Sequence, residues 1–202
     1  DEVKEKAEKY EWAESIAKTY IKRAEEWEIP DYAENADYLF ITDNAHKCFN
    51  SAVAWKLTGR DEFAEKSAEF LRRVSDREKG YPVKMKACHQ QLVHEGEFFK
   101  SCAKAYDLIH DCGVISDELH EDIHNTFRIF MKFFDWALCD GGISNWSLAE
   151  IAGALYCAMA VQDRAMIERF VFGTGGAMAH LQAGVYDDGW WCECTIGYNQ
   201  MA

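Results

Sequence analysis

Hydrophobic residues recur at helical spacing along most of the chain, and this period limits the fold more than any other feature. Residues 61–76 are a clear example, because their apolar side chains fall on one face of a helix. The members of this stripe are Phe63, Ala64, Ala68, Leu71 and Val74. Only two prolines occur in the 202 residues. Since no long Gly/Ser-rich linker interrupts the pattern either, we predict one continuous domain over residues 1–202.

Short turns divide this pattern into helices that follow one another as antiparallel hairpins. The spacing predicts helices over residues 3–28, 43–57, 61–76, 90–112, 116–138, 144–161 and 163–172. Residues 185–195 are expected to be loop or short strand. Small residues in the 144–161 helix favour close packing against neighbours. We therefore expect an all-α fold, an incomplete (α/α) toroid. A helical solenoid is the competing architecture, but no repeat of about 34 residues is sustained.

The charge and hydropathy of the chain exclude two classes of partner. A formal net charge of −13 argues against a nucleic-acid binder, which would carry a basic face. No apolar run reaches the roughly 18–20 residues that cross a bilayer, so no membrane partner is expected. An anionic substrate would need a local positive potential, supplied by a few Lys, Arg or His side chains or by helix N-termini.

The eight cysteines do not form a recognisable disulfide or metal pattern. Most lie in apolar helical stretches, where a free thiol behaves as a small hydrophobic side chain. Cys192 and Cys194 are two residues apart, which is not the CxxC spacing of zinc or redox sites. Buried free thiols are predicted, with neither a metal nor a cofactor.

Two further motifs are interpreted as structural. His120-Glu121-Asp122-Ile123-His124 has the HExxH form of zinc proteases. A charged Asp122 at a central position and the lack of a third ligand at a familiar spacing argue against zinc. The Gly173–Gly176 cluster lacks the Lys-Ser/Thr ending of a phosphate-binding loop, so we predict a turn that ends a helix.

Two segments contain the residues most suited to chemistry. Asn145 falls at the start of a predicted helix, where its amide and the unpaired backbone N–H groups can face an anion. Capping of that helix is the structural alternative. In the second segment, Asp188-Gly189 precedes Trp190 and Trp191, which suggest an aromatic wall for sugar rings, with core packing as the alternative.

In order and spacing, these segments resemble the heparinase II/III-like polysaccharide lyases, which include heparan sulfate and alginate lyases. The matching elements are Asn145-Trp146, the Asp188-Gly189 turn, Glu193 and Tyr198. Tyr198 follows Glu193 by five residues and Asn145 by 53 (198 − 145). The resemblance covers residues 140–199 best and extends more weakly over 45–138. Asn199 stands where many members have His, which affects the expected substrate more than the reaction.

The resemblance implies β-elimination on an acidic, uronate-containing polysaccharide or oligosaccharide. Asn145 would neutralise the uronate carboxylate, and Tyr198 would donate a proton to the leaving oxygen or act as base. Trp146, Trp190, Trp191 and Glu193 would bind substrate. Near the start of the 90–112 helix, Gln91 and His94 are the first cleft residues to test.

The family also implies a β-sandwich domain that follows the toroid and contributes a further His. We therefore expect this chain to be the N-terminal part of a longer enzyme and to be inactive alone. Two other functions stay open. One is an α/α glycoside hydrolase that uses Asp140, Asp187, Asp188 or Glu193 as paired carboxylates, and the other is a helical scaffold without catalysis. The resemblance implies a periplasmic or secreted protein, whereas the many free cysteines are compatible with the cytoplasm.

Overall fold

The computed structural model describes residues 2–31, 41–82, 92–138 and 142–193. Within these ranges all regular secondary structure is helical, apart from one antiparallel bridge between Val185 and Trp191. The all-α prediction is confirmed. In chain order the helices are α1 (Glu2–Lys9), α2 (Glu11–Glu26), α4 (Thr42–Thr58), α5 (Asp61–Val74), α6 (Leu92–Ile109), α7 (Asp117–Ala137), α8 (Asn145–Ala160), α9 (Arg164–Phe172) and α10 (Ala177–Gly184).

Turn and cap residues end these helices as the sequence predicts. Gly59 follows α4 with φ +70°, a left-handed conformation that glycine adopts without strain. The Ser116 hydroxyl caps α7 by accepting the backbone N–H of Leu119. Gly173 ends α9, which confirms the predicted helix-terminating turn.

Successive helices pair in opposite directions, whereas α6 and α8 run the same way. Two hydrogen bonds show that α4 and α5 are antiparallel, because the later residue of α4 bonds to the earlier residue of α5. The Ser51 hydroxyl donates to the Phe63 carbonyl and the Ser67 hydroxyl to the Cys48 carbonyl, each at 2.9 Å. On α6 and α8, Gly96 lies against Gly153, and Cys157 Sγ lies 3.9 Å from the Phe99 carbonyl oxygen.

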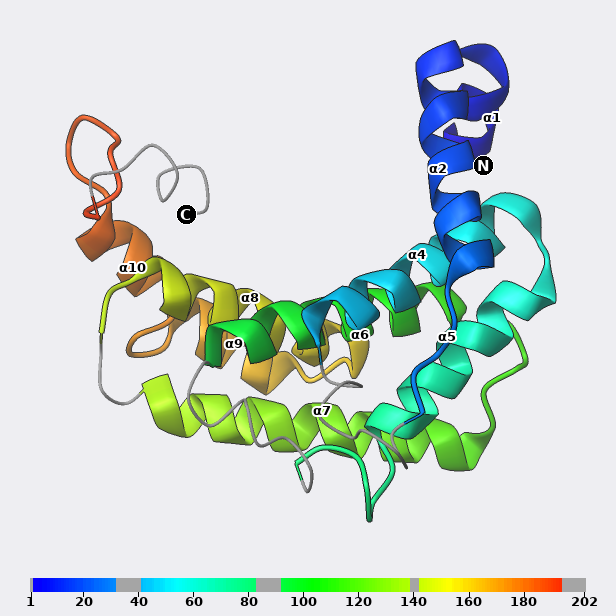
Figure 1. Ribbon diagram of the computed structural model, residues 1–202. Coiled ribbons are helices and arrows are strands. Elements are labelled where there is room, and N and C mark those ends of the chain that lie inside the picture. Colours follow the sequence, from blue (N-terminus) through cyan, green and yellow to red (C-terminus); the bar gives the residue numbers. More distant parts are fainter. Residues whose placement is uncertain (1, 32–40, 83–91, 139–141, 194–202) are drawn as a thin grey trace.

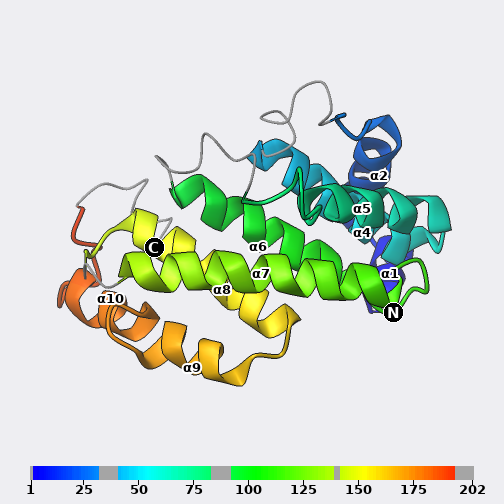
Figure 2. The same cartoon turned by 90° about the horizontal axis from the view of Figure 1, so that it is seen from below.

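Alternate helices share a layer (Figures 1 and 2). The layer of α2, α4, α6 and α8 is continuous, each helix lying beside the next. Along the other side of α8 lie α7 and α9, and α5 packs on α4, α6 and α7. Since α4, α6 and α8 run in the same direction, their N-terminal ends lie at one edge of the layer.

The closest helix contact in this layer joins α6 to α8 at two glycines. A Cβ atom on Gly153 would lie 2.3 Å from the Gly96 carbonyl oxygen, and one on Gly96 would lie 2.6 Å from the Ala149 carbonyl oxygen. Side chains at either position would separate the helices. The predicted close packing of the small-residue helix 144–161 is therefore confirmed.

Aromatic rings fill the space between α6 and α7. Phe99 stacks on Phe130 with ring centroids 4.3 Å apart, and Tyr81 meets Phe99 edge-on at 4.8 Å. Phe134 and Phe170 continue this layer toward α9. Aromatic rings are most of the largest fully buried side chains among the described residues, so removal of their surface from water is a major stabilising term.

Two elements differ from the prediction. The helix expected over residues 3–28 breaks at Tyr10, whose backbone is extended, and α1 folds back beside α2. This turn brings Val3 and Ala7 to the apolar residues Trp12 and Ile16 of α2. No glycine or proline marks the break, so it has no local signal in the sequence. Helix α10 was not expected, because eight residues are too few to show a clear period.

The cysteines and the helix lengths agree with expectation where the structure describes them. Cys48, Cys102, Cys112 and Cys157 are free thiols. Burial raises the pKa of the Cys48, Cys102 and Cys157 thiols, which keeps them protonated and unreactive. None of the described helices is both long and apolar enough to cross a membrane.

We predict that Gly153→Ala lowers the free energy of unfolding by about 1–3 kcal/mol and Tm by about 3–10 °C, because its Cβ would clash with backbone atoms of α6. Gly142→Ala is the matched control, since a Cβ there meets no atom within 4 Å. Thermal unfolding followed by circular dichroism measures both. Equal Tm values for the two variants would show that α6 and α8 do not need this contact.

Candidate functional site

Two segments predicted to act together meet at the N-terminus of α8. Ser144 is the N-cap, and its hydroxyl accepts the backbone N–H of Ser147 at 3.1 Å. Asn145 is the first helical residue, so helix capping does not explain its side chain. The helix end is therefore built by serine and leaves the asparagine carboxamide available for another role.

Glu193, 48 residues further along the chain, binds this helix end. Its Oε2 accepts the backbone N–H of Asn145 and the indole N–H of Trp191, both at 2.7 Å. A carboxylate at a helix N-terminus is stabilised by the unpaired N–H groups and the helix dipole. The expectation that the Asn145 N–H faces an external anion is thereby corrected, because Glu193 supplies the anion from within the chain.

The carboxamide of Asn145 lines a hollow of about 500 Å³ between α6, α8 and α10. Asn145 is only 4% exposed, and among the described residues its side chain has no hydrogen-bond partner. Glu97 and Lys100, an ion pair at 2.6 Å, line the same hollow from α6. The remaining lining is apolar and comes mainly from α8. A buried amide, a cation and a carboxylate thus converge on one space.

The tryptophans of the second segment do not form a continuous wall. Trp191 is 1% exposed, and its ring packs so closely on Gly184 that a Cβ there would lie 2.3 Å from it. This corrects the expectation that Trp191 stacks on a sugar, and the core-packing alternative holds for it. Trp190 and Trp146 are exposed, at 42% and 53%. These two indoles remain available to a ligand.

A tight hairpin carries Glu193 to its position. The backbone N–H of Tyr186 donates to the Trp190 carbonyl at 2.8 Å, and Gly189 closes the turn with φ +85°. Asp188 Oδ1 accepts the backbone N–H of Trp190 at 3.0 Å. Residues 185–193 are thus turn and bridge, as the composition predicts. The turn itself brings the buried Trp191 and the Glu193 carboxylate to α8.

The other predicted site residues fall in different places. His94 is exposed on the first turn of α6 and does not line the hollow. Tyr198, Gln91 and Asp140 lie outside the described residues. Lys100 was missed by the sequence analysis, although its spacing of three from Glu97 on a helix is typical of an ion pair.

A pair of buried carboxyl groups, Glu95 and Glu150, flanks the glycine contact of α6 and α8. Glu95 accepts the Tyr81 hydroxyl at 3.4 Å. Burial, and secondly the charge of Glu95, raises the pKa of Glu150 to about 7. The sequence analysis missed Glu150, yet an acidic residue among Ala149, Ile151 and Ala152 was an available signal. These groups meet because the glycines bring the two helices together.

The HExxH motif is engaged within the protein. Tyr106 Oη lies 2.7 Å from both His120 Nδ1 and His124 Nε2. Burial lowers the pKa of His124, and so do Arg128 and His120. The described residues contain no cluster of three His, Cys, Asp or Glu side chains suited to a metal. A hydrogen-bonded His-Tyr-His group between α6 and α7 accounts for the motif.

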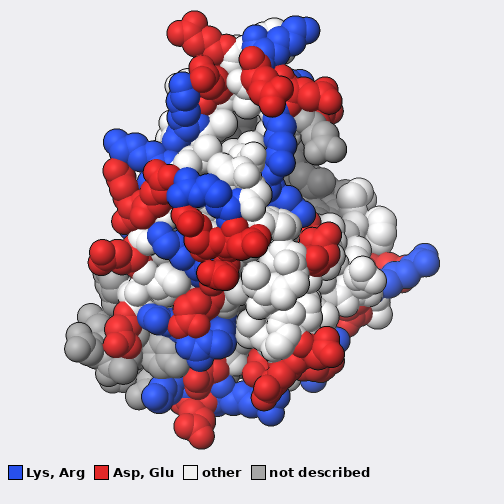
Figure 3. Space-filling model, turned by 90° about the vertical axis from the view of Figure 1, so that its right-hand side faces the viewer, with Lys and Arg blue, Asp and Glu red and all other residues white. Residues whose placement is uncertain are grey.

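Basic and acidic side chains alternate on the face formed by the N-terminal helices and α5 (Figure 3). Arg60 bridges Glu25 and Glu62, and Arg72 and Arg73 both bind Glu69. No extended basic field forms on this face. At the hollow beside Asn145, the cation among the lining residues is Lys100.

Glu193→Ala should lower the free energy of unfolding by about 2–4 kcal/mol, because it leaves the N–H groups of Asn145 and Trp191 without their acceptor. Asp188→Ala on the same hairpin removes an exposed hydrogen bond and should cost less than about 1 kcal/mol. Urea unfolding measures both values. A loss from Glu193→Ala no larger than that from Asp188→Ala contradicts the role assigned to this carboxylate.

Glu150→Gln should stabilise the protein in a pH-dependent way. The folded-state pKa of about 7 lies above the ordinary value of 4.5, so the fold favours protonated Glu150. The wild type loses this stability as pH rises from 4.5 through about 7, whereas glutamine stays neutral. The variant should therefore gain a few degrees in Tm above pH 7 and nothing at pH 4.5. A gain that is the same at both pH values would refute the titration of Glu150.

Neither a protein-family model nor a curated protein matches the chain, so the interpretation of this site rests on its own geometry.

Proposed function

We propose that the chain is the helical part of a polysaccharide lyase that cleaves uronate-containing chains by β-elimination. One observation carries the proposal: Asn145 lines a hollow, only 4% of the residue is exposed, and its carboxamide has no hydrogen-bond partner among the described residues. A carboxamide that lines a hollow without a partner inside the protein can donate its N–H groups to a ligand.

Chemically, the carboxamide suits the acidic step of β-elimination. The proton at C5 of a uronate becomes acidic when the adjacent carboxylate is neutralised, because the intermediate has enolate character. A fixed N–H donor aimed at the developing charge contributes about 3–4 kcal/mol in comparable sites. Glu193 holds the backbone of Asn145, so the amide is positioned before substrate arrives.

Lys100 adds the local cation that an anionic substrate needs. It lines the same hollow as Asn145 and is paired with Glu97. A uronate carboxylate entering there would meet an ammonium and an amide within a largely apolar wall, where such interactions are stronger than in water. Trp146 and Trp190 are the exposed rings that can stack on neighbouring sugars.

Tyr198 is proposed as the proton-transfer residue. A free phenol has a pKa of about 10, so it donates a proton to the leaving oxygen at neutral pH without further help. To act as base it needs nearby positive charge that lowers its pKa. In this proposal Asn145 stabilises the intermediate, while Tyr198 as phenolate takes the C5 proton and as phenol returns it to the leaving oxygen when the C4–O bond breaks and the C4–C5 double bond forms.

The hydrolase alternative receives less support from the described carboxylates. Asp187 and Asp188 are exposed on the hairpin turn, and Oε2 of Glu193 already accepts two N–H groups. A hydrolase needs two carboxyl groups across one glycosidic bond, separated by about 5–9 Å. The two reactions also differ in product, since only elimination creates a conjugated double bond.

The test is ultraviolet absorbance of the full-length protein with heparan sulfate, alginate and other uronate polymers. We expect absorbing, unsaturated ends to form with at least one polymer. Asn145→Ala should lower kcat by about 100- to 1000-fold with a smaller change in KM, because the lost donor acts mainly on the transition state. Tyr198→Phe should abolish turnover.

Gln182→Ala is the matched control, since this side chain is exposed on α10 and does not line the hollow. Its activity should equal that of the wild type. Reducing ends without ultraviolet absorbance would identify a hydrolase. Full activity of both Asn145→Ala and Tyr198→Phe would exclude the site altogether.

A further inference from the structure

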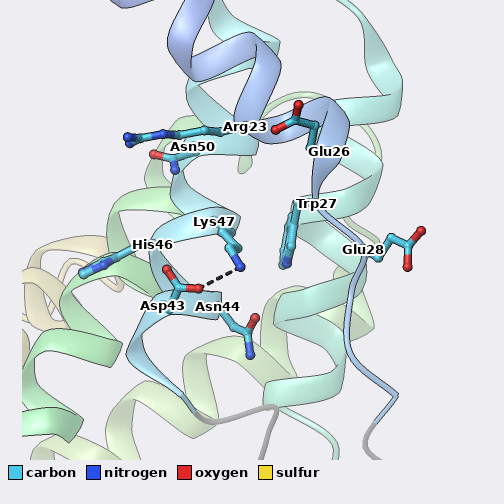
Figure 4. Close-up of a pocket in the computed structure, with 9 residues that line it drawn as sticks. All are labelled: Arg23, Glu26, Trp27, Glu28, Asp43, Asn44, His46, Lys47 and Asn50. Carbon is cyan, nitrogen blue, oxygen red and sulfur yellow. Dashed lines mark ion pairs between the residues drawn. The ribbon is translucent and has the colours of Figure 1, made fainter.

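A second hollow, of about 530 Å³, lies between the end of α2 and the first turns of α4 (Figure 4). Arg23 and Trp27 line it from the α2 side, and Asp43, Lys47 and Asn50 line it from one face of α4. The volume falls within the range of about 300–1000 Å³ that small-molecule sites occupy. Its walls are rich in polar groups from two separate helices.

One buried polar atom in this pocket, the Trp27 indole nitrogen, has no hydrogen-bond partner among the described residues. Trp27 is 4% exposed, and its indole nitrogen, turned to the side of Lys47 in Figure 4, donates to no acceptor. Asn50 is 9% exposed and lies further along α4. An indole N–H buried without an acceptor is unfavourable, so a ligand oxygen that accepts it is favoured.

The charges of the pocket favour a ligand without net charge. Two basic side chains, Arg23 and Lys47, face three acidic ones, of which Asp43 is paired with Lys47 at 2.7 Å. The carboxylates of the pocket would repel an anion, and the side chains of Arg23 and Lys47 would repel a cation. Hydroxyl groups both donate and accept, so they can satisfy Trp27 and Asn50 together with the charged rim.

We propose that this pocket binds a neutral, hydroxyl-rich ligand of sugar size, with the Trp27 indole N–H and the Asn50 carboxamide as its central partners. Lys47 lies opposite the indole in Figure 4, and its side chain is 37% exposed. Because the indole nitrogen is covered, a side chain of the pocket wall must move for a hydroxyl to reach it. Arg23, at the rim, then binds a second hydroxyl.

This site does not depend on the hollow beside Asn145. The α4 residues lie in the layer that also contains α6 and α8, near the same edge where α8 begins. The two pockets differ in character, since the hollow at Asn145 is largely apolar with one ion pair. Each can therefore be tested without the other.

The test uses the indole N–H resonances of the ¹⁵N-labelled chain, one from each of its seven tryptophans. Trp27→Phe assigns the Trp27 signal and keeps a ring in the core. The probes are methyl glucoside, methyl galactoside and N-acetylglucosamine as neutral sugars, with glucuronate and glucosamine as charged ones. We expect a neutral sugar to shift the Trp27 resonance in a saturable way and to bind at least about tenfold more tightly than either charged probe.

Asn50→Ala should weaken this binding by about tenfold and Arg23→Gln by several-fold. Arg23 is exposed, so its variant keeps the test valid if Asn50→Ala unfolds. Asn125→Ala, exposed on α7, is the matched control and should bind as the wild type does. An unmoved Trp27 resonance with every neutral sugar, tighter binding of a charged probe, or unchanged affinity in both pocket variants overturns the proposal.

Discussion

The backbone contact between Gly96 and Gly153 determines the geometry of the centre of the molecule. Because neither residue has a side chain, α6 and α8 approach so closely that an added Cβ on Gly153 would lie 2.3 Å from a carbonyl oxygen. That approach buries Glu95 and Glu150 next to each other and places Lys100 beside Asn145. Between α6 and α7, by contrast, the rings of Phe99, Phe127 and Phe130 fill the space and separate the two backbones. The close contact of α6 with α8 thus positions both the hollow and the buried carboxyl pair.

Helix positions were largely predictable, because apolar period, caps and glycine turns all act locally. Ser116, Gly59 and Gly173 end or begin helices as their chemistry requires. The break at Tyr10 was not predictable, since it depends on an apolar contact between α1 and α2 and has no local breaker. The grouping of helices into layers was not predictable either, because it depends on packing between segments far apart in sequence.

The candidate site, like the fold, has features that the sequence predicts and features that depend on long-range packing. That Asn145 and Glu193 belong together was expected from their order in the chain, and their hydrogen bond joins the two segments. The groups that form this contact were not expected. The Glu193 carboxylate accepts the backbone N–H of Asn145 and the indole N–H of Trp191, and does not face a ligand. Adjacent tryptophans cannot be divided by sequence into one core ring and one surface ring. Their burial depends on Gly184, which the hairpin brings against Trp191.

The central claim is that the carboxamide of Asn145 and the phenol of Tyr198 meet on one uronate sugar. A crystal structure of the full-length protein with a bound uronate oligosaccharide, with turnover blocked by Tyr198→Phe, measures this most directly. The account predicts that Nδ2 of Asn145 lies within about 3 Å of the sugar carboxylate and that the ring at position 198 faces the glycosidic oxygen. A sugar bound away from the hollow, or a residue 198 on the opposite side of the molecule from Asn145, would contradict it.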